Sequence, residues 1–156
     1  NMDNIDIKIL EILSEDVRTP IKVIADTVHL SQASVSTRIT AMRSAGIIRP
    51  SHVSIAPAAL GYKFRCFVEI KVPIKKRAEF EAFCADCHHI IEGSYITGEY
   101  SAFLKAAFCD PDEMDTFLQK LNTFGETRTS VALRTIVASR GIRIPSDLIK
   151  QFEGDV

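Results

Sequence analysis

The sequence lacks the features that mark membrane and secreted proteins. It contains no apolar run near the roughly 20 residues that a membrane-spanning helix requires. Its N-terminus carries Asp3 and Asp6 where a signal peptide has a basic and then an apolar stretch. With 46% hydrophobic and 25% charged residues, the composition is that of a globular protein. We therefore expect a cytoplasmic protein without membrane contact.

Motifs for catalysis are also missing. The four histidines form no spaced set with a nucleophile, and the sequence has neither a glycine-rich phosphate loop nor a Ser-His-Asp arrangement. Nothing in the sequence therefore indicates an enzyme or a bound cofactor.

Acidic residues are absent from one long segment. No Asp or Glu occurs from Thr27 to Val68, whereas five basic residues fall inside this segment. They are Arg38, Arg43, Arg49, Lys63 and Arg65. The formal net charge of the whole chain is −1, so this positive charge is local. Such a segment can meet DNA phosphates although the whole protein is not basic.

The acid-free segment includes most of a helix-turn-helix pattern. Helical patterns cover residues 21–28 and 31–43 and are separated only by His29 and Leu30. Ser31 is placed to cap the second helix and Gly46 to end it. In this motif the first helix braces the second, which lies in the DNA major groove. The alternative is an ordinary helical hairpin whose surface happens to lack acids.

The helical period divides the second helix into a buried and an exposed face. Val35, Ile39 and Met42 recur at the i, i+4, i+7 spacing of a buried stripe. The opposite side is small and polar, which lets a helix backbone approach base edges closely. The predicted DNA contacts are Gln32, Ala33, Ser34, Thr37, Arg38, Thr40, Arg43 and Arg49.

These candidates are expected to have different roles. Ser34 and Thr37 are the main candidates for base-edge contacts, and Gln32 is a candidate for bidentate contact to adenine. Arg43 and Arg49 are expected to contact phosphates, where they position the protein without reading sequence. Each of these residues can instead be a merely solvated surface group.

A further amphipathic helix is expected from Asp3 to Leu13. Asp3 and Asp6 stand at its start, where capping explains them better than a metal site or an acid–base pair. Arg38 lies between the two faces of the later helix. It therefore either reaches a phosphate or pairs with an acid of this first helix.

The boundaries of the first domain follow from proline and glycine. We expect a winged helix-turn-helix domain at residues 2–55, with Ile47–Arg49 and Val53–Ile55 forming a short two-stranded wing. Residues 56–63, which hold a proline and a helix-ending glycine, are interpreted as a linker. Residues 64–156 then form the second domain.

The second domain alternates strands and helices. Strands are expected at residues 64–72, 92–97, 102–109 and 131–139, helices at 75–87 and 111–123, and a short terminal helix at 147–152. Asp110 before Pro111 marks a helix start. Two strand–helix–strand units joined by a hairpin at 98–100 predict an α+β protein with a ferredoxin-like βαββαβ domain. The sheet face without helices is expected to be apolar and to be buried in a homodimer.

One cysteine motif raises an alternative function. Cys84-Ala85-Asp86-Cys87-His88 has a spacing seen in haem attachment, thiol redox and zinc sites. However, no second Cys-x-x-Cys pair completes a zinc site, and Cys84 and Cys87 share an apolar helix stripe with Phe80. We therefore expect packing rather than a metal or redox role.

Short motifs are spread over nearly the whole chain. They are Asp3-x-x-Asp6-x-x-Ile9-Leu10, Arg18, Ile24-Ala25, Leu30-Ser31, Arg38-Ile39, Gly46-Ile47-Ile48, Leu60-Gly61-Tyr62 and Thr97-Gly98-Glu99-Tyr100. Together they resemble the Lrp/AsnC, or feast/famine, family of transcriptional regulators. The resemblance implies a C-terminal RAM-type domain that binds small amino-acid effectors between dimers, and assembly of dimers into tetramers or octamers.

The resemblance also implies an effector site at the hairpin. Its candidate residues are Gly98, Glu99, Tyr100, Ser101 and, less directly, Ser130. Gly98 permits a close backbone approach, Tyr100 offers an amphipathic ring and Ser101 a hydroxyl, so the hairpin can hold a zwitterion. The alternative is a tight turn with a packing tyrosine. Ser101 stands where many family members carry Asp, which leaves the identity and existence of the effector open.

The sequence thus predicts a sequence-specific regulator that binds double-stranded DNA and responds to a small metabolite. The expected metabolite is an amino-acid effector, and no cofactor is expected. Two alternatives stay open. One is a chromosome-organising DNA-binding protein without an effector, and the other is a cysteine-centred redox or metal-binding protein.

Overall fold

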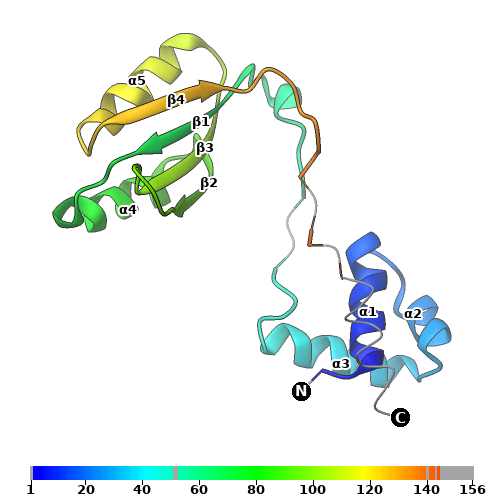
Figure 1. Cartoon of the computed structure of the whole chain (residues 1–156). Helices are drawn as coiled ribbons and strands as arrows, with labels where there is room; N and C mark the ends of the chain where they lie inside the picture. The colour runs from blue at the N-terminus through cyan, green and yellow to red at the C-terminus, as the bar shows by residue number, and fades with distance from the viewer. Residues whose placement is uncertain (1, 51–52, 140, 143, 145–156) are drawn as a thin grey trace. The chain divides into compact units, whose positions relative to one another are not determined.

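The computed structural model describes residues 2–50, 53–139, 141, 142 and 144 (Figure 1). The chain divides into two compact units, one built on Asn1–Val53 and the other spanning Ser54–Val137, and the described residues from Ala138 onward group with the first. The terminal helix expected at 147–152 lies outside the described residues. Among the helices of the described part, none combines the length and hydropathy needed to cross a bilayer.

The first unit contains three helices, α1 (Asn4–Glu15), α2 (Ile21–Val28) and α3 (Gln32–Ser44). All three were expected from sequence, with ends that differ by at most two residues. The capping role of the two aspartates is confirmed. The Asp6 backbone N–H donates to Asp3 Oδ1 at 2.9 Å, and the Asp3 N–H donates to Asp6 Oδ2 at 3.0 Å.

The predicted buried stripe of α3 lies in the core of this unit. Val35, Ile39 and Met42 are 0%, 6% and 4% exposed and pack with Ile9 of α1 and Ile24 of α2. The turn between α2 and α3 places His29 in the left-handed region at φ 55°. Ser31 then caps α3 by accepting a hydrogen bond from the Ser34 N–H at 3.1 Å. These features hold α3 against the other two helices by one face only.

The predicted wing is wrong for the described residues, since neither 46–50 nor 53–56 contains a strand. The reason lies in where the amide groups point. The Ile47 and Ile48 N–H groups both donate to the Met42 carbonyl, at 2.9 and 3.2 Å, and so close the end of α3. They are not free to form a ladder, and Pro50 has no N–H to add. A short 3₁₀ helix, η1 (Pro57–Leu60), follows and ends at Gly61 with φ 85°.

The second unit has the expected ferredoxin-like order of elements. These are β1 (Phe64–Ile70), the 3₁₀ turn η2 (Ile74–Lys76), α4 (Arg77–Asp86), β2 (Ile90–Tyr95), β3 (Ala102–Phe108), α5 (Pro111–Asn122) and β4 (Thr127–Val131). The antiparallel sheet has the order β2-β3-β1-β4. Asp110 caps α5 as predicted, by accepting from the Glu113 N–H at 2.9 Å.

The last strand was placed wrongly by the sequence reading. It covers Thr127–Val131 rather than 131–139. Gly125 sets its start, because a Cβ there would lie 1.9 Å from the Lys71 carbonyl oxygen and so prevent this close approach to the end of β1. The apolar residues that suggested a later strand are exposed, with Leu133 at 96% and Ile136 at 91%.

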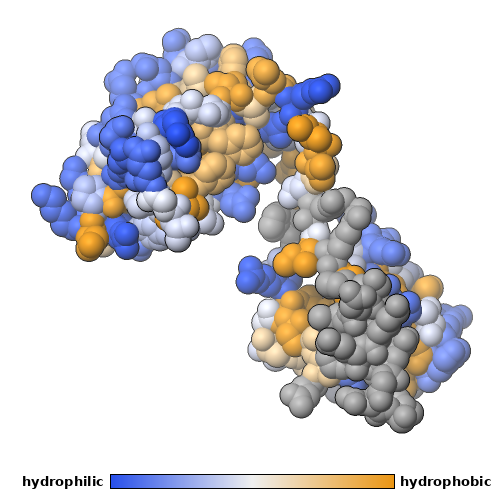
Figure 2. Space-filling view, viewed as in Figure 1, coloured by the Kyte–Doolittle hydropathy of each residue, from blue (hydrophilic) through white to orange (hydrophobic). Residues whose placement is uncertain are grey.

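Both helices cover one face of the sheet, where Val68, Leu104 and Phe108 pack with Phe80 of α4 and with residues of α5. The other face was expected to be apolar, and this is only partly right. At its centre Phe67 and Phe103 stack with ring centroids 5.6 Å apart. Charged residues of the same face surround them: Arg65, Glu69, Glu92, Lys105 and Arg128. Figure 2 shows apolar area bordered by hydrophilic side chains on this unit.

Candidate DNA interface and effector sites

The outer face of α3 presents the predicted DNA contacts to solvent. The exposed candidates on α3 are Gln32, Ala33, Ser34, Thr37, Thr40 and Arg43, and Arg49 is exposed beyond the end of the helix. Among them Ser34, Thr37 and Thr40 carry small hydroxyl groups. The Thr37 hydroxyl donates to the Ala33 carbonyl at 3.0 Å, and the Ser34 and Ser31 hydroxyls lie 2.9 Å apart. Because these side chains are short, a base-pair edge can approach this face of the helix closely.

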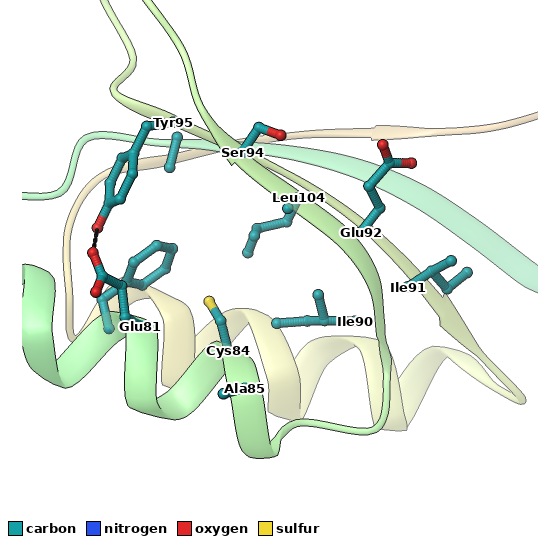
Figure 3. Close-up of a pocket in the computed structure, with 12 residues that line it drawn as sticks. Glu81, Cys84, Ala85, Ile90, Ile91, Glu92, Ser94, Tyr95 and Leu104 are labelled. Carbon is teal, nitrogen blue, oxygen red and sulfur yellow. Dashed lines mark hydrogen bonds between the residues drawn. The ribbon is translucent and has the colours of Figure 1, made fainter. Parts of the chain in front are cut away.

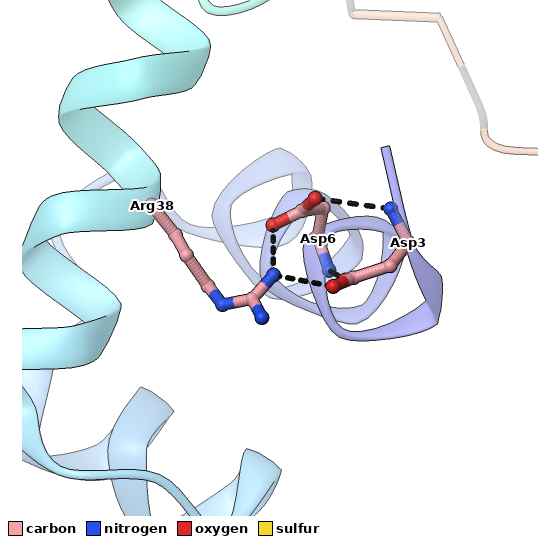
Figure 4. Close-up of polar contacts among 3 residues, drawn as sticks. All are labelled: Asp3, Asp6 and Arg38. Atoms are coloured by element: carbon pink, nitrogen blue, oxygen red, sulfur yellow. Dashed lines mark hydrogen bonds and ion pairs between the residues drawn. The ribbon is translucent and has the colours of Figure 1, made fainter. Parts of the chain in front are cut away.

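Arg38 differs from the other candidates because it is already paired (Figure 4). Its Nη1 donates to Asp3 Oδ2 at 2.7 Å and to Asp6 Oδ1 at 2.8 Å. These hydrogen bonds, that of Asp6 first, raise the pKa of Arg38. Burial acts to raise the pKa of Asp3, but hydrogen bonds from the Asp6 backbone and Arg38 outweigh it and lower the pKa. Arg38 was expected either to reach a phosphate or to pair with an acid of the first helix, and in the structure it forms the ion pair with Asp3 and Asp6.

The hairpin between β2 and β3 carries a network of charges. Gly98 has a φ of 117°, a backbone conformation that residues with a side chain rarely adopt. Glu99 accepts from Lys71 Nζ at 2.8 Å, and the same nitrogen lies 3.2 Å from Glu126 Oε2. The Tyr100 ring centroid lies 4.9 Å from Lys71 Nζ and 4.9 Å from Arg128 Cζ. Sequence reasoning missed Lys71, Glu126 and Arg128, which come from the ends of other strands.

Ser101 forms hydrogen bonds inside the protein. Its hydroxyl accepts from the Val72 N–H at 2.8 Å and donates to the Ile70 carbonyl at 3.2 Å. The Ser101 side chain therefore connects the hairpin to the end of β1. Ser130 is not part of this group, because it pairs in register with Phe67, three residues before Ile70.

A groove of about 400 Å³ lies between α4 and β2 (Figure 3). Phe80, Ala102 and Leu104 are among its apolar lining residues, and Cys84 points into it from α4. At one end the Tyr95 hydroxyl donates to Glu81 Oε1 at 2.9 Å. Sequence reasoning did not find this groove. The one available signal was that Glu81 and Cys84 share a face of the predicted helix.

The geometry of the Cys-His motif gives little support to a redox or metal role. The pKa of the Cys84 thiol is raised to about 11, mainly by burial and also by the nearby Cys87 and Glu81. A protonated thiol is a poor nucleophile and metal ligand. In the part of the chain that the structure describes, no group of three or more His, Cys, Asp or Glu residues is placed to hold a metal ion.

Comparison with known proteins agrees with both halves of the fold. The family model of the AsnC-type helix-turn-helix domain matches residues 2–43, and the family model of the Lrp/AsnC ligand binding domain matches residues 65–142. The chain belongs to the Lrp/AsnC family of transcriptional regulators. The regulatory protein AsnC of Haemophilus influenzae is 32% identical over 143 residues, covering 86% of this chain and 93% of that protein. The regulator FL11 of Pyrococcus abyssi is 30% identical over 138 residues, covering 86% of this chain and 91% of that protein.

Solved Lrp/AsnC structures have the same fold. The structure of Escherichia coli AsnC is 28% identical and superposes with a TM-score of 0.81, covering 92% of this chain and 99% of that one. The structure of the regulator NMB0573 of Neisseria meningitidis, solved as a complex with L-Met, superposes with a TM-score of 0.83 and covers 96% of this chain and 99% of that one. At 23% identity, this second likeness shows the fold alone.

Proposed function

We propose that this member of the Lrp/AsnC family is a cytoplasmic, sequence-specific DNA-binding regulator whose α3 lies in the major groove. The observation that carries the proposal is the exposed face of α3. It is small, polar and free of acids, while the opposite face is fixed in a three-helix core. A merely solvated helix face would instead be filled with Lys and Glu.

The regulator is proposed to act as a homodimer or a larger assembly of dimers. One small polar helix makes few base contacts, so useful affinity needs two helices spaced about 34 Å apart or a multiple of that along the duplex. The open sheet face supports this proposal, because the stacked Phe67 and Phe103 with a charged border have the composition of an interface core and rim. Sedimentation of the protein at micromolar concentration tests it, and a monomer would contradict it.

A response to an amino acid is the second part of the proposal. The match to the Lrp/AsnC ligand binding domain supports it. An effector would shift the population among assemblies and so change which DNA sites are bound together. The paired charges and the internally bonded Ser101 favour one competing function, a DNA-organising protein without an effector. The ratio of affinities for promoter and random DNA separates these two functions.

The DNA-binding part is tested by a gel shift with Thr37→Glu. Thr37 is exposed, and a carboxylate on this face would repel phosphates, so specific binding should be abolished while the protein stays folded. Thr116→Glu is a matched control. Thr116 is also exposed, and its hydroxyl likewise donates to the carbonyl four residues earlier, at 2.9 Å, but it lies on α5. Unchanged affinity of the Thr37 variant would remove α3 from its proposed role.

A further inference from the structure

The turn between α2 and α3 contains an uncommon backbone conformation. His29 ends α2 with a φ of 55° and a ψ of 40°, in the left-handed region. Among the described residues, every other position with a positive φ is a glycine. Residues with a side chain rarely adopt this conformation, although histidine tolerates it better than most. A glycine at this position would form the same turn without the steric cost.

The turn is closed by the backbone and does not need the histidine ring. The N–H groups of His29 and Leu30 both donate to the Ala25 carbonyl, the second of them at 3.0 Å. These hydrogen bonds satisfy the end of α2. Ala25 is itself buried, with 2% of its surface exposed, so the turn starts from a fixed point in the core. The imidazole of His29 is therefore free for another role.

The His29 side chain is exposed and has no partner within the described part of the chain. The histidines of the second unit differ in this respect. The rings of His88 and His89 lie 4.0 Å apart, and the His89 ring lies 4.8 Å from that of Phe108. Asp26 is the last acid before His29, and no other follows until Glu69. The ring of His29 thus stands at the start of the acid-free segment.

The position of His29 in the motif places it near DNA phosphates. It precedes Gln32, the first residue of α3, by three positions, which span at most roughly 11 Å. In a docked helix-turn-helix, the N-terminal residues of the second helix contact base edges while the first helix crosses the DNA backbone. The turn that joins the two helices then lies at the wall of the major groove, which is about 12 Å wide.

We propose that the imidazole of His29 donates a hydrogen bond to a DNA phosphate at the wall of the major groove. An imidazole carries an N–H donor whether it is neutral or protonated, and phosphate oxygens accept. Such a contact positions α3 in the groove without reading sequence. The proposal rests on the proposed DNA-binding role of α3 and adds a residue that lies outside this helix. It also gives the exposed ring in the turn a function.

His29→Gly tests the proposal because it keeps the left-handed turn and removes the ring. The melting temperature should stay the same or rise. Affinity for specific and random duplexes should nevertheless fall by the same factor, about threefold to tenfold, as one hydrogen bond to a charged group is lost. A residue needed only for the turn would show no loss of affinity in a variant that keeps its stability. His88→Asn, which removes an exposed histidine of the second unit, is the control and should bind DNA like the wild type.

A second measurement modifies the DNA instead of the protein. Uncharged methylphosphonates are placed in the duplex one backbone position at a time, and binding of the wild type is compared with that of His29→Gly. At the phosphate that His29 contacts, the modification should weaken the wild type clearly more than the variant. This comparison does not depend on any difference in stability between the two proteins. If every position weakens both proteins equally, His29 contacts no phosphate and the proposal is wrong.

The remaining outcomes separate this proposal from the proposed function. If His29→Gly binds all duplexes like the wild type while Thr37→Glu abolishes specific binding, the role of His29 is wrong and that of α3 stands. A loss confined to one base pair would mean that His29 reads a base, which also contradicts a phosphate contact. If the wild type binds no duplex at low salt, the proposed function fails together with this proposal.

Discussion

Arg38 and Asp6 are 32 positions apart in the sequence, yet the Arg38 Nη1 atom lies 2.8 Å from Asp6 Oδ1. The same nitrogen donates to Asp3, and Asp3 and Asp6 each accept from the other's backbone N–H at the start of α1. One cation therefore links the start of α1 to the middle of α3. It holds in place the helix that carries the proposed DNA contacts.

Replacing Arg38 by Met should lower the free energy of unfolding by about 1 kcal/mol, because the largely buried Asp6 loses its cation while the pair is partly screened by solvent. Urea denaturation measures this, with Arg43→Met as the control on an exposed arginine of the same helix. The salt dependence of DNA binding should keep its slope, since the charge of Arg38 is already neutralised. A slope reduced by about one would instead show a phosphate contact.

Acid should weaken the first unit through Asp3. Its pKa is lowered in the folded protein from the ordinary value of 3.8, so folding favours the ionised form. The resulting stability is fully present above the unfolded-state pKa and is lost as the pH falls through the lower folded-state pKa. Asp3→Asn keeps a capping side chain without the charge. Denaturation between about pH 7 and pH 3 should show a slightly smaller loss of stability for this variant, and an identical pH profile would contradict the prediction.

Ser101→Ala should destabilise the second unit. Val72 is only 5% exposed, and without the Ser101 hydroxyl its backbone N–H would lose its hydrogen-bond acceptor. The expected cost is about 1–3 kcal/mol. Thermal unfolding measures the loss, and hydrogen exchange at the Val72 amide should become faster. Ser94→Ala, at an exposed position in β2, is the control. Equal stability of the two variants would show that the Ser101 hydroxyl is dispensable.

Arg49→Ala should weaken binding to all DNA sequences by a similar factor. A phosphate contact carries no base information, so specificity should remain while the salt slope falls by about one. Gel shifts with specific and random duplexes at several salt concentrations measure both quantities. A loss confined to one base position would mean that Arg49 reads a base.

Local signals in the sequence were enough to place most of the elements. Ser31 and Asp110 cap their helices through bonds to residues three positions away, and the 3.6-residue period alone identifies the buried stripe of α3. The alternation of strands and helices likewise predicted the ferredoxin-like order. These features depend on neighbours in the chain, which the sequence displays directly.

The sequence by itself determined the two folds, the helix ends and the face that α3 exposes, because caps and hydrophobic periods act over a few residues. Only the tertiary structure decided that Arg38 pairs with the aspartates of α1, that Ser101 bonds to the end of β1, and that the last strand begins after Gly125. It also joined Glu81 of α4 to Tyr95 of β2 at one end of the groove. Each of these contacts joins residues from different elements, and chain packing fixes which of several possible partners a side chain meets.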